Sequence, residues 1–248
     1  MCEALARVPL LQVERLSKSF GGVLAVDGVS FTLEQGDLLG IMGPNGSGKT
    51  TLFNLIAGAL APDRGSIRLR GEEVGGLSPH RICGKGVART FQLVRPFPQL
   101  SALYNVRVGQ LYGRAPARTD PRRLLSLVGL DGKASARAAD LTLIDRKRLE
   151  LARALATSPE LLLLDEFLAG LNPAETAGAM TLIRTLVTQG LTVLMVEHIV
   201  WALMALSRRI IVLSAGEKIA EGSPDAVATD PAVLDAYLGA DPGSWLRA

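Results

Sequence analysis

Apolar residues along the chain follow patterns that predict strands, with helices between them. Residues 10–20 and 23–33 alternate or cluster apolar and β-branched positions on either side of a double glycine, which is typical of two strands joined by a turn. Residues 37–42, 161–164 and 191–196 are instead short and mostly apolar runs, as expected of strands buried on both faces. The chain therefore combines a hairpin with central strands of the parallel type.

Helical patterns follow each of the buried strands, beginning with residues 51–58 after the first of them. From Pro79 to about Ala156 the periodicity is helical and is broken by loops, which indicates a helical insertion. Near the C-terminus, residues 210–214 and 217–221 predict a second hairpin, and residues 231–238 predict a terminal helix.

These elements predict an α/β fold with a core around a mixed sheet, an antiparallel β subdomain near the N-terminus and an inserted helical subdomain. The predicted single domain divides into a core with its β subdomain at 10–77 and 159–222, a helical subdomain at 78–158 and a helical tail at 223–248. In such a sheet a ligand binds at the C-terminal ends of the parallel strands.

The segment between the first buried strand and its helix fits the phosphate-binding pattern of a glycine, four residues and then Gly-Lys-Thr. Glycine lets backbone amides turn toward a phosphate, and the lysine adds a positive charge. The Thr50 hydroxyl, at the start of the helix, can ligate Mg²⁺, and the helix N-terminus favours phosphate. The predicted nucleotide-binding residues are Gly43, Pro44, Asn45, Gly46, Ser47, Gly48, Lys49, Thr50 and Thr51. The structural alternative is a glycine-rich turn that contains a lysine by chance, but strand, loop and helix stand in the order that the motif needs.

Polar side chains that could contact a metal ion, a water or a phosphate follow the other buried strands. Asp165 is placed to hold Mg²⁺, directly or through water. Glu166 is placed to polarise a water near the γ-phosphate. The alternative for this acidic pair is a helix cap or a surface turn. His198 follows an analogous strand, where an imidazole can contact the γ-phosphate, or is otherwise a core or capping residue. Gln92 supplies an amide able to reach the metal or the water. Phe20 can stack on an adenine ring or pack against the turn that follows it.

Composition narrows the classes of protein to which this chain of 248 residues can belong. Its 48% hydrophobic and 21% charged residues suit a globular protein rather than a disordered one. A net charge of +3, with scattered arginines, does not favour nucleic acid as a partner. Cys2 and Cys83 lack metal-ligand spacing, so we expect free thiols in a reducing compartment. The N-terminus has no secretory pattern, and charged residues interrupt the most apolar region, 191–215, so we expect a cytoplasmic protein that other subunits hold at a membrane.

Taken together, the phosphate loop, Gln92, residues 161–166 and His198 resemble the Walker A, Q-loop, Walker B and H-loop of an ABC-type ATPase. The resemblance covers nearly the whole chain and extends to Phe20 at the aromatic A-loop position and to residues 170–173 at the D-loop. It implies a P-loop NTPase core that binds ATP and Mg²⁺ and hydrolyses the ATP.

Within that family the chain is most similar to the ATPase subunits of branched-chain amino acid importers of the Liv type. The stretches that carry this narrower match are 88–92 with 97–100, 105–106, 170–173, and the tail 221–224 through 235–239. The resemblance implies a subunit at the cytoplasmic face of the inner membrane that drives amino acid uptake through two permease subunits, with an extracytoplasmic solute-binding protein as an indirect partner. Two alternatives stay open: a regulatory ATP-binding subunit with weak hydrolysis, and the ATPase of a related transporter for urea, amides or lipopolysaccharide.

The resemblance further implies two ATPase subunits that sandwich two ATP molecules, each site closed by the partner's LSGGQ signature. This chain has a degenerate signature, Leu141, Thr142, Leu143, Ile144 and Asp145. Thr142 can replace the serine hydroxyl, but Leu143 and Ile144 add bulk where the backbone should approach phosphate, and Asp145 adds negative charge. We therefore expect a different ATPase chain as the partner. The helix after Thr142 still presents N–H groups, so a working motif remains the alternative.

Overall fold

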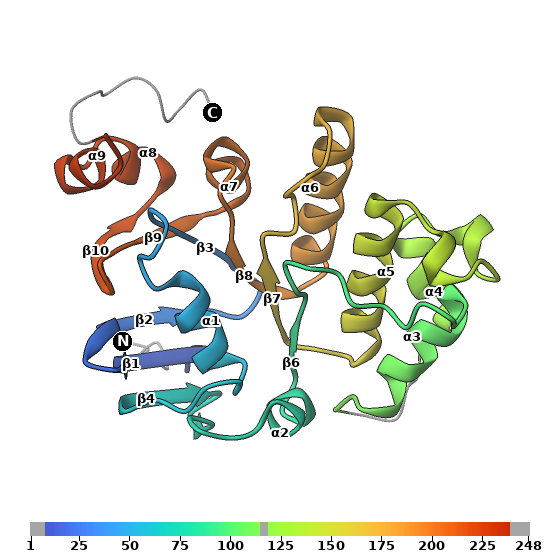
Figure 1. Ribbon diagram of the computed structural model, residues 1–248, viewed down its shortest axis with the longest axis horizontal. Coiled ribbons are helices and arrows are strands. Elements are labelled where there is room, and N and C mark those ends of the chain that lie inside the picture. The colour runs from blue at the N-terminus through green and yellow to red at the C-terminus, as the bar shows by residue number, and fades with distance from the viewer. Residues whose placement is uncertain (1–7, 115–118, 239–248) are drawn as a thin grey trace, which may run out of the picture.

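The computed structural model describes residues 8–114 and 119–238, which form two sheets and the helices packed around them (Figure 1). The larger sheet has six strands in the order β10-β9-β3-β8-β7-β6, and all its pairings are parallel except that of β10 with β9. Its strands are β3 (Leu38–Met42), β6 (Val87–Arg89), β7 (Leu161–Asp165), β8 (Thr192–Val196), β9 (Arg209–Ser214) and β10 (Glu217–Gly222). The predicted α/β class with a mixed sheet is confirmed.

The smaller sheet is antiparallel and has the order β2-β1-β4-β5. Its strands are β1 (Leu11–Phe20), β2 (Val23–Leu33), β4 (Arg64–Leu69) and β5 (Glu72–Glu73). The two predicted hairpins are both present, β1 with β2 in this sheet and β9 with β10 in the larger one.

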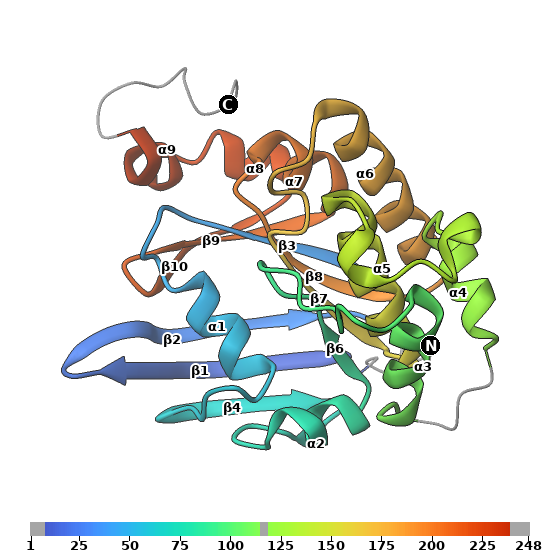
Figure 2. The same cartoon turned by 45° about the vertical axis from the view of Figure 1, so that its right-hand side comes forward.

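The central strands are buried on both faces because a separate core covers each face. The side chains of Leu161 and Leu163 pack into one core with α1 (Lys49–Ile56) and the smaller sheet. Those of Leu162 and Leu164 point the other way and pack with α5 (Leu143–Ala156) and α6 (Pro173–Thr188). Since side chains alternate along a strand, an uninterrupted apolar run is what two cores require. In Figure 2, α1 lies between the two sheets.

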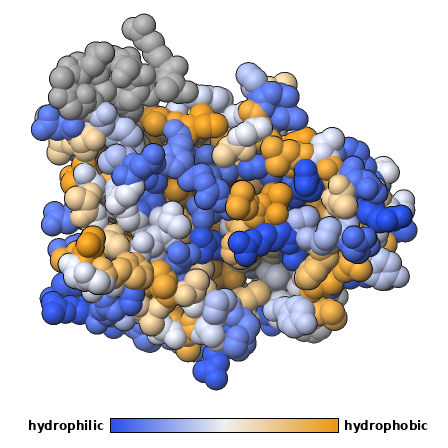
Figure 3. All heavy atoms as spheres, in the orientation of Figure 1, coloured by the Kyte–Doolittle hydropathy of each residue, from blue (hydrophilic) through white to orange (hydrophobic). Residues whose placement is uncertain are grey.

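The remaining helices surround this framework. They are α2 (Pro79–Gly84), α3 (Ala102–Leu111), α4 (Pro121–Leu127), α7 (Val200–Leu206), α8 (Pro224–Ala228) and α9 (Pro231–Leu238), with 3₁₀ turns at Asp131–Lys133 and Ala138–Asp140. α3, α4 and α5 gather at one side of the molecule, whereas α8 and α9 lie beside α7 and the β9–β10 hairpin (Figure 1). On the face shown in Figure 3, apolar residues form separate patches among polar ones.

One strand lies inside the segment 78–158 that the sequence assigns to a helical subdomain. β6 is an edge strand of the larger sheet, with Ala88 opposite Leu162 of β7. A strand of three residues is too short to show an alternating pattern, so the helices on either side dominate the sequence signal. The helices α3 to α5 follow β6, and the proposed domain boundaries remain a prediction.

Four strands deliver their following loops to one edge of the larger sheet. β3, β6, β7 and β8 run parallel, so their C-terminal ends meet on the same side. The phosphate-loop residues follow β3, and Glu166 and His198 follow β7 and β8. Cys83 is a free and partly buried thiol, as predicted, whereas Cys2 lies outside the described residues.

Candidate nucleotide site

The phosphate loop has a backbone that only glycine permits at several positions. Gly46 and Gly48 adopt φ values of 79° and 100°, in the left-handed region where a Cβ causes strain. A Cβ at Gly48 would also lie 2.2 Å from the Ala25 carbonyl oxygen, and one at Gly43 would lie 2.2 Å from that of Leu213. Gly48 is the N-cap of α1, so the first amides of this helix stay open toward the loop.

The side chains of this loop fit a phosphate ligand. Lys49 is 6% exposed, and its Nζ donates hydrogen bonds to the carbonyls of Gly43 at 2.7 Å and Pro44 at 2.9 Å. Burial lowers the pKa of Lys49, and the charge of Glu166 opposes that shift. The buried Ser47 Oγ has no hydrogen-bond partner within the described residues. A phosphate oxygen would satisfy this hydroxyl and take up the lysine charge.

A cavity of about 350 Å³ opens over the loop. Its lining residues are Ala25, Asn45, Gly46, Ser47, Gly48, Lys49, Thr50, Thr51, Gln92, Glu166 and His198. The structure thus brings together most of the predicted loop residues and three predicted catalytic side chains. Ala25, on β2, was not predicted, because a small apolar residue in a strand carries no signal of a ligand.

Glu166 is the centre of the polar contacts in this cavity. Gln92 Nε2 lies 2.6 Å from Glu166 Oε2, and His198 Nε2 lies 2.7 Å from Glu166 Oε1. The residue is 9% exposed, and its φ of 49° is in the left-handed region although it has a Cβ. Such strained backbone is common at functional sites, where neighbouring contacts hold it. Here it directs the carboxylate between an amide and an imidazole.

Asp165 ends β7 one residue earlier and forms an ion pair that the sequence does not reveal. Arg89 Nη2 lies 2.7 Å from Asp165 Oδ2, and Arg89 Nη1 donates to Asn54 Oδ1 of α1 at 2.6 Å. Arg89 therefore joins the end of β6 to Asp165 and to the helix that follows the phosphate loop. Its role requires the pairing of β6 with β7, which no local pattern predicts.

Some predicted site residues lie apart from the cavity lining. Phe20 is 47% exposed at the end of β1, with the Lys18 ammonium 5.7 Å from its ring centre. Gly43, Pro44 and Asp165 are not among the residues that line the cavity: the carbonyls of Gly43 and Pro44 accept from Lys49, and Asp165 pairs with Arg89.

The degenerate signature differs from expectation in how its polar groups are used. Thr142 is the N-cap of α5, and its hydroxyl donates to Asp145 Oδ2 at 2.7 Å and accepts from the Asp145 amide at 3.3 Å. Asp145 is 4% exposed and forms an ion pair with Lys133. Burial acts to raise the pKa of Asp145, but the hydrogen bonds from Lys133 and Thr142 outweigh it and lower the value. The negative charge is therefore compensated within the chain, and the threonine hydroxyl is already engaged.

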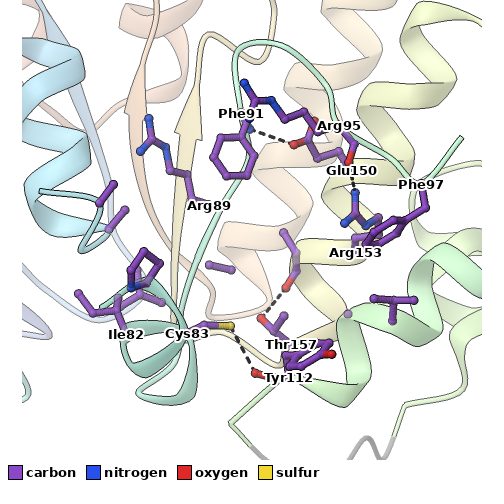
Figure 4. Close-up of a pocket in the computed structure, with 18 residues that line it drawn as sticks. Ile82, Cys83, Arg89, Phe91, Arg95, Phe97, Tyr112, Glu150, Arg153 and Thr157 are labelled. Carbon is purple, nitrogen blue, oxygen red and sulfur yellow. Dashed lines mark hydrogen bonds between the residues drawn. The ribbon is translucent and has the colours of Figure 1, made fainter. Parts of the chain in front are cut away.

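A second concavity, of about 400 Å³, lies between α2, β6, α3 and α5 (Figure 4). Glu150 forms part of its wall and accepts the Phe91 amide at 3.1 Å, and burial raises the Glu150 pKa to about 7. Arg153 stacks 4.8 Å from the centre of the Phe97 ring and donates to the Arg95 carbonyl at 2.7 Å. This groove combines apolar and basic side chains and begins at the residues just before Gln92.

The fold and the cavity define a P-loop nucleotide-binding domain, and comparison with known proteins gives its family. The family model described as ABC transporter matches residues 26–169, and the chain belongs to that family. A second model, described as branched-chain amino acid ATP-binding cassette transporter, matches residues 217–242. The family predicted from the motifs is confirmed.

Individual relatives agree with this assignment. The branched-chain amino acid transport ATP-binding protein BraF of Pseudomonas aeruginosa is 39% identical over 250 residues, which cover 93% of this chain and 98% of BraF. The lipopolysaccharide export ATP-binding protein LptB of Acidithiobacillus ferridurans is 36% identical over 233 residues, covering 93% and 97%. A crystal structure of an ABC transporter ATP-binding cassette in its ADP conformation superposes with a TM-score of 0.84 at 29% identity, covering 93% of this chain and 99% of the other.

Proposed function

We propose that this chain hydrolyses ATP as the energy-coupling subunit of an importer for branched-chain or related amino acids. The observation that carries hydrolysis is the Glu166 carboxylate, which Gln92 and His198 hold at the wall of the phosphate-loop cavity. The similarity to BraF and the match of the C-terminal family model support the class of solute.

The proposed reaction is the attack of water on the γ-phosphorus of ATP. Glu166 accepts a proton from the water as the new oxygen–phosphorus bond forms and the bond to the β–γ bridging oxygen breaks, so that ADP leaves with that oxygen. Lys49 and the open amides of α1 stabilise the negative charge on the phosphates. His198 and Gln92 orient the carboxylate, and each retains further hydrogen-bonding capacity toward the γ-phosphate or the water.

Mg²⁺ fits the same site through the Thr50 hydroxyl and the Gln92 amide oxygen at the cavity wall, and through the Asp165 carboxylate behind that wall, which would act by way of a water because Arg89 pairs with it. All three are hard oxygen donors, and the Gln92 contact with Glu166 uses the amide nitrogen and leaves the oxygen available. Within the described ranges no group of three or more His, Cys, Asp or Glu side chains could hold a metal. A site with few protein ligands is usual for Mg²⁺ that also binds substrate phosphates. When bound, the ion supplies positive charge that neutralises those phosphates.

The partners are proposed from the surface around the site. The groove beside Phe91 and Arg95 is suited to receive a segment of a permease subunit, because its apolar wall adjoins the backbone that leads to Gln92. The engaged Thr142 hydroxyl favours a different ATPase chain, with an intact signature, as the second subunit. In the described part of the chain no helix is long and apolar enough to cross a membrane. From the similarity to BraF we place the subunit at the cytoplasmic face of the inner membrane, attached to two permease subunits that receive the solute from a solute-binding protein.

A second candidate is the ATPase of a related transporter, which the similarity to the lipopolysaccharide export protein LptB supports. The chemistry at Glu166 is the same in both candidates. Uptake of a radiolabelled branched-chain amino acid by membrane vesicles that contain the complete complex distinguishes them: ATP-driven uptake supports the importer, and no uptake above that of vesicles without ATP contradicts it.

Two substitutions test the ATPase assignment. Glu166→Gln should keep ATP binding within about threefold and lower turnover by at least about 100-fold, because it removes the proton acceptor and leaves the loop intact. Lys49→Ala should instead weaken nucleotide binding itself. Phosphate release by the chain assembled with its candidate partner, together with equilibrium ATP binding, measures both effects. Near-normal turnover of the Glu166→Gln variant would sink the assignment of the base.

A further inference from the structure

Lys147 is a buried lysine directly behind the site. It lies on α5, five residues after the N-cap Thr142, and is 4% exposed. Its Nζ donates to the main-chain carbonyls of Phe167 at 2.9 Å and Glu166 at 3.3 Å. Lysine is almost never fully buried unless its charge has partners, so these contacts call for an explanation.

The contacts of Lys147 fall on the strained turn that presents the Glu166 carboxylate. On one side of this turn the Glu166 amide donates to the Val196 carbonyl of β8 at 2.9 Å. On the other side the two carbonyls of the turn accept from Lys147. The left-handed φ of Glu166 is thus fixed between β8 and α5. Because the backbone sets the direction of the side chain, these contacts also aim the carboxylate at Gln92 and His198.

Two buried carboxylates act on the charge of Lys147; one holds the segment that follows Glu166, and the other holds the backbone beside Gln92. Glu197 accepts the Leu168 amide at 2.8 Å and immediately precedes His198. Glu150, one turn further along α5, accepts the Phe91 amide at 3.1 Å beside Gln92, and Figure 4 shows this hydrogen bond. Burial lowers the pKa of Lys147, whereas the charges of Glu197, Glu150 and Glu166 oppose that shift. The Lys147 cluster, defined as Lys147, Glu150 and Glu197, therefore touches or adjoins every loop that carries a proposed catalytic side chain.

We propose that Lys147 is a positioning residue for ATP hydrolysis, which holds the Glu166 turn and links it to the signature end of α5. This inference rests on the proposed ATPase function. Lys147 lies five positions after Thr142, which is a rise of about 7.5 Å along the helix axis. A displacement of α5 by a partner subunit at Thr142 is therefore transmitted to the carbonyls of Glu166 and Phe167. Contact of the partner with the signature of this chain thereby affects the position of the chain's own Glu166.

Lys147→Met tests the proposal, since methionine keeps much of the side-chain volume but cannot donate to the two carbonyls. We expect kcat to fall by about 30-fold while the equilibrium Kd for ATP changes by less than about threefold, because Lys147 does not line the cavity. Lys147→Arg, which restores a charged donor, should recover at least about a fifth of the lost activity. The matched control is Lys85→Met, at a partly exposed lysine that pairs with Glu72, and it should leave kcat unchanged.

A second readout does not depend on turnover. Hydrogen exchange in peptides that cover residues 165–170 should become at least about tenfold faster in Lys147→Met than in the parent chain, and should not change in Lys85→Met. The proposal is overturned if the fall in kcat is fully explained by a smaller fraction of folded protein, or if hydrogen exchange in residues 165–170 is unchanged. If the parent chain does not hydrolyse ATP, the proposed function fails and the exchange result alone decides the role of Lys147. If Lys147→Met does not fold, Lys147→Gln, whose shorter and uncharged side chain cannot replace the lysine at both carbonyls, is measured in both assays, and exchange and kcat equal to those of Lys85→Met then overturn the proposal.

Discussion

Arg89 and Asp165 form a nearly buried ion pair, with side chains 12% and 6% exposed. Removal of the guanidinium leaves the carboxylate without a charge partner, and Asn54 Oδ1 also loses a hydrogen-bond donor. Breaking such a pair from one side costs about 3–5 kcal/mol. We therefore predict that Arg89→Met lowers the free energy of unfolding by about 3 kcal/mol, measured by urea denaturation.

A double-variant cycle separates this pair from general packing. The combination of Arg89→Met with Asp165→Asn should cost clearly less than the sum of the two single changes, because no unpaired charge remains. The matched control, Arg68→Met, removes one partner of a half-exposed pair with Glu14 and should cost less than about 1 kcal/mol. Additive single effects would show that Arg89 does not stabilise Asp165.

At the residue scale, the sequence predicts the side chains that stand at the ends of regular elements. Glu166 and His198 follow buried strands, and Gln92 belongs to a recognisable motif, so their meeting in one cavity could be anticipated. Arg89 could not be assigned a role, because its partner Asp165 is 76 residues away and the pair exists only when β6 lies beside β7. Lys147 was missed for the same reason, since its acceptors are main-chain carbonyls on another element.

At the scale of elements, Glu150 on α5 and Glu197 after β8 are acids buried where helices and strands pack. Burial raises both pKa values to about 7, from an ordinary value of 4.5. Between pH 4.5 and 7 the folded chain therefore holds more protons than the unfolded chain, so the free energy of unfolding falls as pH rises through this window. Acids with lowered pKa values, such as Asp63 and Asp145, oppose this trend only at lower pH.

We predict a loss of roughly 3 kcal/mol of stability between pH 5 and pH 7.5, from two shifted carboxyl groups at about 1.4 kcal/mol per pH unit each, discounted for partial solvent screening. Urea denaturation at a series of pH values measures it. Glu197→Gln should reduce the slope by about half, whereas Glu217→Gln, at an exposed position of β10, should leave it unchanged. Stability that rises across this window would contradict the prediction.

Long patterns predicted their elements well, and short ones did not. The buried runs that became β7 and β8 and the helix at 231–238 were confirmed, because each has enough residues to show a period or a continuous apolar face. β6 has three residues, and its membership of the larger sheet depends on pairing with β7. The tertiary neighbours of such a segment, rather than its own composition, determine its structure.

At the scale of the whole molecule, the proposed pairing with a second ATPase subunit makes the cavity one half of a nucleotide site. The surface that would close a second site begins at Thr142, whose hydroxyl is engaged by Asp145, and continues through Leu143, which is 42% exposed. Asp145 is held in turn by Lys133. A second copy of this chain would therefore meet bulk and an occupied hydroxyl where a γ-phosphate needs hydrogen-bond donors.

This arrangement predicts how the chain associates. In the Glu166→Gln background, which stops turnover, Mg-ATP should leave the isolated chain monomeric by analytical ultracentrifugation at concentrations of tens of micromolar. Adding the candidate partner ATPase with an intact signature should produce an ATP-dependent heterodimer. A further variant with Leu143→Ser, Ile144→Gly and Asp145→Gln removes the bulk and the carboxylate and should shift the isolated chain toward a homodimer. An ATP-dependent homodimer of the Glu166→Gln chain with a Kd below about 1 μM, worth about 8 kcal/mol, would show instead that Thr142 and the α5 amides serve as a working signature.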